Sequence, residues 1–305
     1  MNAAIRLVSS MATRALLADL AEAWNARGGT PLEYAYDHPQ VRHIDAHVPY
    51  FVALPTTSGT GSEVGRSAVI SEDDTHVKRI VFSPHILARV VFADPELTVG
   101  LPPAVTAATG MDALTHNVES YLSPAYHPLC DGIALEGVRI AARALPVAVQ
   151  NGRDLQARSD MLMASLMGAI AFQKDLGAVH SCAHALSTVV DMHHGLANGI
   201  MIDHVMRFNL PAATDKLAEL AHVARAPNGD TGTPEARASA FIDWLTDLKG
   251  ELGIPAQLSE FTAPRRVERS DLPRLVAVAV ADTCHQTNPR TCTQADFERL
   301  FAAAF

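Results

Sequence analysis

Histidines gather in one short stretch of the chain. Four of its 14 histidines fall within GAVHSCAHALSTVVDMHHGLAN, at residues 177–198. His180 and His184 are four residues apart, so on a helix they share one face. His194 lies ten residues beyond His184, where a turn ends one predicted helix and begins the next. Packing alone rarely requires so many imidazoles, which serve as metal ligands and as proton carriers near neutral pH.

A second segment, TGMDALTHNVES, adds a carboxylate. It places Asp112 and His116 four residues apart on one face of another predicted helix. The two segments can bring four side chains to one point, namely Asp112, His116, His180 and His194. One carboxylate and three imidazoles suit a divalent first-row metal such as Zn²⁺ or Fe²⁺. His184 would then lie near the site without being a required ligand.

Other interpretations of these residues stay open. An aspartate and a histidine four residues apart are also an ordinary pair on a helix surface. Two imidazoles on an apolar face are harder to explain by packing. We interpret His193 as a solvated neighbour of His194. Cys182 could serve as a soft ligand, but it lies two residues from His180 and points away from that face.

The elements that must position these residues change in character along the chain. Residues 50–94 hold four short runs rich in Val, Ile and Phe, which are YFVALP, RSAVIS, RIVFSP and RVVFAD. Polar or Gly-rich turns separate them, so we expect strands there. One helix is expected before them, over residues 11–27.

Helical spacing dominates after residue 99. The first predicted helix there opens near Pro103, a residue typical of helix starts. The sequence therefore predicts an α/β part at residues 1–98 and an all-helical domain at residues 99–305. A surface loop is expected at residues 226–234. The other predicted helices cover residues 131–149, 154–174, 176–190, 195–209, 213–225, 234–252 and 271–284.

Composition narrows the class of protein. The chain has 305 residues, of which 48% are hydrophobic, and a net charge of -9 without any basic run. We therefore expect a globular protein that binds no nucleic acid. The longest apolar stretches are broken by charge or proline, so no membrane span is expected. Four cysteines without a CxxC pair indicate reduced thiols and a cytoplasmic location. We also expect a homo-oligomer.

Both histidine-bearing segments resemble one family. TAATGMDALTHNVESYLS and GAVHSCAHALSTVVDMHHGLANGIMIDHVMRFN are similar to the iron-containing (group III) alcohol dehydrogenases. So are PTTSGTGSEV at 55–64, DPELTVGLPP at 94–103 and TNPR at 287–290, and the resemblance covers about residues 30–300. It implies a dehydroquinate synthase-like fold, here with an incomplete Rossmann-like part followed by a helical metal-binding domain.

The resemblance also implies roles for the polar residues. The first segment supplies an aspartate and a histidine ligand, which match Asp112 and His116. The second supplies two histidine ligands fourteen residues apart, which match His180 and His194. The family's substrate-side histidine lies four residues after the third ligand and matches His184. This set of donors accepts Fe²⁺, which we favour, or Zn²⁺.

The segment PTTSGTGSEV points to a nucleotide. Small hydroxyls and glycines let the backbone approach and hydrogen-bond a phosphate or amide, although an ordinary Ser/Thr/Gly turn also fits the pattern. The resemblance implies that Thr56, Thr57 and Thr60 contact the nicotinamide cofactor, either NAD or NADP. It further implies that Lys78 reaches the cofactor ribose.

One family feature has no match in this chain. The family carries a glycine-rich phosphate turn near its start, but Arg6, Leu7 and Val8 stand where the glycines belong, before SSM at residues 9–11. A Val or Leu side chain hinders close approach of the backbone to a pyrophosphate. This departure bears directly on dinucleotide binding.

The activity implied by the resemblance is that of an NAD(P)-dependent alcohol dehydrogenase or aldehyde reductase. Hydride would pass between a metal-bound alkoxide and nicotinamide, with a small alcohol or aldehyde as substrate. His184 would orient the alcohol or relay its proton. His285 either lines the pocket or is a loop histidine. Two other functions stay open, a truncated inactive relative that keeps the metal but not the cofactor, and a metallohydrolase.

Overall fold

The computed structural model describes residues 5–7, 32–34, 48–71 and 78–305. The chain divides into two compact units, which are described separately below. The chain passes from one unit to the other more than once. The predicted division after residue 98 assigns residues 55–61 and 93–98 to the α/β part, whereas the structure has them in the helical unit. The first unit takes in residues 1–54 and 62–92, and the second takes in residues 55–61 and 93–305.

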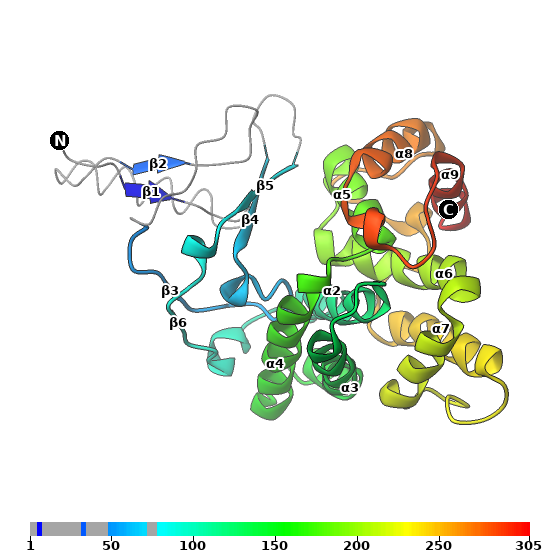
Figure 1. Cartoon of the computed structure of the whole chain (residues 1–305), viewed down its shortest axis with the longest axis horizontal. Helices are drawn as coiled ribbons and strands as arrows, with labels where there is room; N and C mark the ends of the chain where they lie inside the picture. The colour runs from blue at the N-terminus through cyan, green and yellow to red at the C-terminus, as the bar shows by residue number, and fades with distance from the viewer. Residues whose placement is uncertain (1–4, 8–31, 35–47, 72–77) are drawn as a thin grey trace. The chain divides into compact units, whose positions relative to one another are not determined.

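The first unit carries the strands, and each of the four predicted runs contains one. They pair in three two-stranded sheets, two parallel and one antiparallel (Figure 1). The helix predicted over residues 11–27 lies outside the described residues. The pairs are β1 (Ile5–Leu7) with β2 (Leu32–Tyr34), β3 (Val52–Ala53) with β6 (Val90–Val91), and β4 (Ser67–Ser71) with β5 (Lys78–Phe82).

The second unit is helical, as the sequence predicts (Figure 1). Proline stands in the first turn of several of its helices, where the missing N–H has no helical partner anyway. None of the described helices is long and apolar enough to cross a bilayer. The helices are α2 (Pro103–Leu122), α3 (Pro128–Gln150), α4 (Leu155–Ala171), α5 (Ala178–Val190), α6 (His194–Ala224), α7 (Pro234–Glu251), α8 (Leu272–Ala281) and α9 (Gln294–Ala303).

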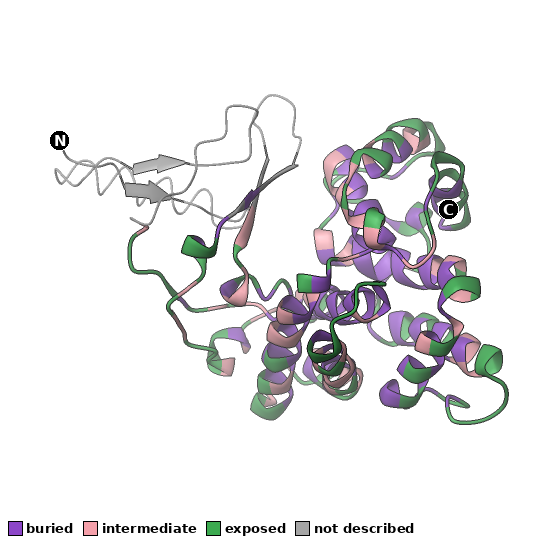
Figure 2. Cartoon of the chain, in the orientation of Figure 1, coloured by how far each residue is buried: buried purple, intermediate pink, exposed green. Residues whose placement is uncertain are grey.

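Helix α2 forms the centre of the helical core. It packs against α3, α4 and α6, and from Thr106 onward nearly every residue is buried (Figure 2). A helix that is buried on all sides belongs to the interior of a protein. The polar residues of α2 therefore need partners inside the unit, and two of them are the predicted ligands Asp112 and His116.

The two helices predicted at residues 195–209 and 213–225 run together as α6 across a kink at Ala213, just after Pro211, where the backbone is not helical. Two other features differ from the prediction. Helix α8 ends at Ala281, and a short 3-10 helix, Cys284–Thr287, follows it. The sequence analysis missed α9, although Thr293 and Asp296 form a capping box at its start.

A buried ion pair joins α7 to α6. Lys249 Nζ donates to Asp203 Oδ1 (2.5 Å) and to the carbonyl oxygen of Ile200 (2.9 Å). Thr246 donates its hydroxyl to Asp203 Oδ2 (3.2 Å). The side chain of Lys249 is only 2% exposed, so its charge depends on these partners.

We expect Lys249→Met to lower the free energy of unfolding by about 3–5 kcal/mol, because it leaves the Asp203 carboxylate buried without its cation. Urea denaturation followed by far-UV circular dichroism measures the loss. The exposed pair Arg207–Asp243 joins the same two helices at 3.8 Å and provides the matched control. Arg207→Met should cost less than about 1 kcal/mol. Equal losses in the two variants would show that burial gives the first pair no special role.

Candidate metal centre

The four predicted ligands come together where three helices meet. Asp112 and His116 lie one turn apart on α2. His180 lies in the first turn of α5, and His194 is the first residue of α6. The Nε2 atoms of His116, His180 and His194 lie 3.8, 3.7 and 3.4 Å from Asp112 Oδ1. Three imidazole nitrogens thus surround one carboxylate oxygen.

Close packing of α6 on α2 places His194. A Cβ added at Gly195 would lie only 2.2 Å from the carbonyl oxygen of Ala108 and 3.2 Å from the Cβ of Asp112. Only glycine lets the two backbones approach so closely. The residue next to His194 in the sequence is therefore what allows the histidine to reach Asp112.

The centre is buried on one side and accessible on the other. Asp112, His116 and His180 are at most 5% exposed. The side chain of His194 is 28% exposed. A metal held here would be shielded at α2 and α5, and approachable past His194.

The protonation states of these side chains suit the binding of a cation. Burial raises the pKa of Asp112, but the nearby histidines, His116 first among them, hold it well below its usual range. Burial lowers the pKa of His116 to about 4, so its imidazole is neutral at pH 7. Burial also lowers the pKa of His180, but hydrogen bonds with Asp112 and Glu119 outweigh it and raise the value to about 9. A metal ion would take the place of the proton that His180 holds between two carboxylates.

The structure adds two polar residues that the sequence analysis did not single out. Glu119 accepts a hydrogen bond from His180 Nδ1 at 2.7 Å, which leaves Nε2 to face Asp112. Asn198 donates from Nδ2 to Asp112 Oδ1 at 2.7 Å. Each lies at helical spacing from a predicted ligand, Glu119 three residues after His116 and Asn198 four after His194. That spacing was the available signal.

His184 lies beside the ligands on α5. Its ring stacks on that of His194, with centroids 5.2 Å apart. Its Nδ1 is 2.8 Å from Asp282 Oδ2. Asp282 is held in turn by the Ser181 hydroxyl (2.8 Å) and the Cys284 backbone N–H (2.9 Å). This arrangement fixes the ring orientation of His184 and gives its Nδ1 a carboxylate partner.

The remaining candidates lie away from the centre. His193 is exposed, and its Nδ1 accepts from the Leu196 N–H at the start of α6. Cys182 is fully buried, and burial raises its thiol pKa well above the usual value. His285 turns its Nε2 toward the Val280 carbonyl (3.2 Å) and its ring against a phenylalanine of α9, as a loop histidine would. The described cysteines are all free thiols.

Comparison with known families decides where the chain belongs. A family model described as the C-terminal part of the Fe-containing alcohol dehydrogenase family matches residues 106–305. A second, described as iron-containing alcohol dehydrogenase, matches residues 13–95. The chain belongs to the iron-containing alcohol dehydrogenase family. The family predicted from the two histidine-bearing segments is thereby confirmed.

Members of the iron-containing alcohol dehydrogenase family resemble the chain over most of its length. The 4-hydroxybutyrate dehydrogenase of Cupriavidus necator is 39% identical over 82% of this chain, which spans 64% of that relative. The 1,3-propanediol dehydrogenase of Klebsiella pneumoniae is 38% identical over 88% of this chain, which spans 69% of it. A crystal structure of a 1,3-propanediol oxidoreductase superimposes with a TM-score of 0.81 at 31% identity, covering 99% of this chain and 92% of that one.

One more solved relative bears on the cofactor of the family. Sulfoacetaldehyde reductase from Bifidobacterium kashiwanohense, whose structure is a complex with NAD⁺, has a TM-score of 0.77 and 28% identity. The match covers 88% of this chain and 68% of that one. These neighbours confirm the predicted fold class, an α/β part followed by a helical domain.

In this family member, the predicted nucleotide loop is packed onto the helical unit. Ser165 of α4 donates its hydroxyl to the Gly59 carbonyl at 3.0 Å. Gly61 has a positive φ of 58°, and a Cβ there would lie 2.5 Å from the Ser165 carbonyl oxygen. The loop is therefore fixed by α4. Thr56 and Thr60 are exposed on it, and Thr57 is half-buried.

The other residues predicted for the nucleotide belong to the first unit. Lys78 opens β5, and its side chain is not described. Arg6 and Leu7 lie in β1, whereas Val8 and residues 9–11 lie outside the described residues. Whether these residues meet a cofactor stays a prediction.

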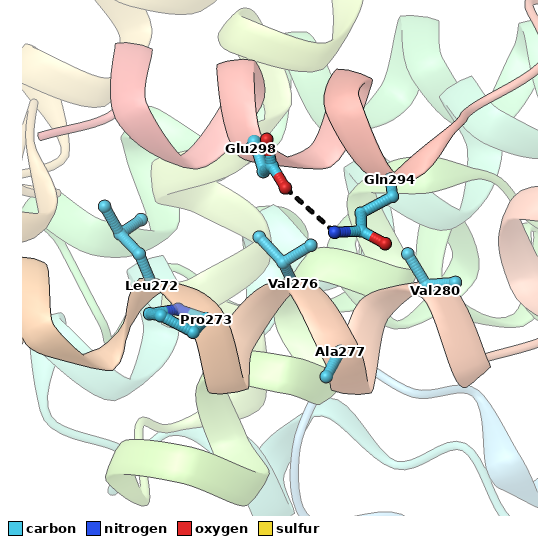
Figure 3. Close-up of a pocket in the computed structure, with 7 residues that line it drawn as sticks. All are labelled: Leu272, Pro273, Val276, Ala277, Val280, Gln294 and Glu298. Atoms are coloured by element: carbon cyan, nitrogen blue, oxygen red, sulfur yellow. Dashed lines mark hydrogen bonds between the residues drawn. The ribbon is translucent and has the colours of Figure 1, made fainter.

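A separate hollow of about 390 Å³ lies between α8 and α9 (Figure 3). Val276 and Val280 of α8 line it with other small apolar side chains. On its α9 side, Gln294 donates to Glu298 at 3.0 Å (Figure 3). Its lining lacks a histidine, a thiol and any pair of titratable groups, so the chemistry belongs to the centre at α2, α5 and α6.

Proposed function

We propose that the chain is a metal-dependent NAD(P) alcohol dehydrogenase or aldehyde reductase. The observation that carries this proposal is the convergence of three imidazole nitrogens on Asp112 Oδ1, within 3.8 Å, in a member of this family. The names of the relatives, which include diol and hydroxy-acid dehydrogenases, support a small alcohol or aldehyde as the substrate.

The donor set fits the metal that the family implies. Asp112, His116, His180 and His194 would hold it, and nitrogen and carboxylate donors of this kind suit Fe²⁺ or Zn²⁺. When bound, such a cation acts as a Lewis acid that lowers the pKa of an alcohol or polarises a carbonyl group. A bound nicotinamide cofactor, either NAD or NADP, would supply the acceptor or donor of the hydride.

The chain's own residues orient the substrate and handle its proton. His184 stacks on His194 with its side chain 15% exposed, and its Nδ1 is hydrogen-bonded to Asp282. With Nδ1–H donated to the carboxylate, Nε2 is the ring atom that would accept the proton of an alcohol and return it in the reverse direction. Asp112, His116 and His180 are buried, so their side of the centre is shielded from solvent.

Cofactor contacts are assigned to Thr56, Thr57, Thr60 and Lys78. The fixed loop that presents the three threonines supports this assignment, since α4 holds its backbone and leaves two hydroxyl side chains exposed. The free thiols of the described cysteines support a cytoplasmic location.

Titration of NADH into metal-quantified protein tests the proposal. We expect saturable binding, seen as a change in nicotinamide fluorescence, followed by oxidation of NADH in the presence of a small aldehyde. Thr60→Val should weaken binding by roughly 3–10-fold, because it removes one hydrogen bond of about 1 kcal/mol. Absence of binding in metal-loaded protein would contradict the dehydrogenase and favour a metal-carrying relative without this activity.

A further inference from the structure

Glu119 makes more contacts at the centre than any spacing argument suggests. It lies seven residues after Asp112 on α2, so it shares that helical face, and it is 2% exposed. Its Oε1 accepts from the Val179 N–H (2.7 Å). Its Oε2 accepts from the Gly177 N–H (3.0 Å), the His180 N–H (3.4 Å) and His180 Nδ1 (2.7 Å). Four donors fill the accepting capacity of one carboxylate.

Three of these donors are backbone groups at the start of α5. The first N–H groups of a helix have no partner within the helix, and its N-terminus attracts negative charge. Gly177, at the N-cap position, has no side chain to cap them. A carboxylate from α2 therefore caps α5 from outside, and fixes the distance between the helices that carry Asp112 and His180.

The fourth donor is the ligand ring itself. His180 Nδ1 donates its N–H to Glu119, so the proton that a metal would displace is the one on Nε2, which faces Asp112 Oδ1 at 3.7 Å. A ring with the proton on Nε2 could not bind a metal through that atom. One buried carboxylate thus sets both the location of His180 and the nitrogen it offers.

We infer that Glu119 is a positioning residue of the metal centre, and that metal affinity depends on its carboxylate through the tautomer and placement of His180. This inference rests on the proposed function, since it presumes that the centre binds a metal. It goes further in naming the group that prepares a ligand before the ion arrives.

Glu119→Gln is the sharpest variant because it keeps the shape of the side chain. An amide has one accepting oxygen and one donating NH₂ group, so it cannot accept from all four donors. With the NH₂ group toward His180 Nδ1, the ring must accept there and carry its proton on Nε2. With the NH₂ group toward the Val179 N–H, a buried donor of α5 meets another donor.

Asn288→Ala provides the matched control. Asn288 Oδ1 accepts from the Ala178 N–H at 3.2 Å, at the same end of α5. Its amide otherwise pairs with Asn209 and donates to the Arg290 carbonyl and the Cys292 sulfur, and none of these hydrogen bonds involves the His180 ring. The control therefore loosens the same helix end while the carboxylate on Nδ1 remains.

The experiment measures the dissociation constant of Co²⁺, by competition with a chelator, for the unaltered protein and both variants. The thermal midpoint of unfolding is also measured for each variant and for the unaltered protein after the metal has been removed. We expect Glu119→Gln to weaken Co²⁺ binding by roughly 10–100-fold, and Asn288→Ala by less than roughly 3-fold. In the metal-free protein, the imidazole ¹⁵N shifts of His180 should report an Nδ1 without its proton in Glu119→Gln alone.

Two results would overturn the inference. One is unchanged Co²⁺ affinity in Glu119→Gln, and the other is equal weakening in both variants in step with their thermal midpoints. If Glu119→Gln fails to fold, Glu119→Asp replaces it. Its shorter carboxylate cannot reach both His180 Nδ1 and the Val179 N–H, so unchanged affinity there overturns the inference too. Failure of the unaltered protein to bind Co²⁺ would instead count against the proposed function itself.

Discussion

His180→Ala should remove the bound metal and the turnover together. The residue offers Nε2 to the centre and is 1% exposed, so water cannot readily take its place. Four-ligand zinc sites bind with about 10–16 kcal/mol in total, so the loss of one ligand is expected to weaken binding by roughly 10²-fold or more. Metal content after gel filtration and aldehyde reduction by NADH measure the two losses.

His193→Ser is the control for this result. His193 stands next to the ligand His194 but is exposed and serves as the N-cap of α6, a role that serine also fills. The variant should keep its metal and its rate. Full metal occupancy in His180→Ala would mean that the ligand set assigned to the centre is wrong.

His184→Ala should spare the metal and lower the turnover by roughly 10²–10⁴-fold, the usual contribution of a positioned acid–base group. The ring has no place among the four donors, so its removal leaves Asp112 and its neighbours in place. Metal content and the steady-state rate, measured on one preparation, separate this variant from a ligand variant. Loss of metal in His184→Ala would contradict the assigned role.

Asp282→Asn examines the partner of His184. The amide can no longer both receive Nδ1–H and accept from Ser181 and Cys284, so we expect a smaller loss of rate than for His184→Ala. If Asp282 acts through His184, the double variant should be no slower than His184→Ala alone. Multiplied losses in the double variant would instead indicate two independent roles.

Much of this centre could be predicted from local spacing. Asp112 and His116 are one helical turn apart, and the fourteen residues from His180 to His194 hold the end of one helix and the start of another. Residues that share one face of a helix can be recognised from the helical period alone. The convergence of the two segments came from the family resemblance, since spacing within each segment does not place them side by side.

The groups that support the ligands carry weaker signals or none. Asp282 lies 98 residues after His184 in the sequence, and only the packing of α8 against α5 brings them together. Asn288 belongs to the TNPR motif, but it accepts from the Ala178 N–H at the start of α5. The two residues are 110 positions apart in the sequence, so only the fold brings them together.

The path of the chain between the two units limits how this protein can be dissected. Residues 55–61 belong to the helical unit although strands of the other unit flank them in sequence, so three stretches of backbone connect the two. A single proteolytic cut cannot separate them. A fragment that starts at residue 93 would hold all four metal donors but lack the segment whose Gly59 carbonyl accepts the Ser165 hydroxyl. Chimeras that exchange the first unit for that of a relative must therefore leave residues 55–61 in place with the helices.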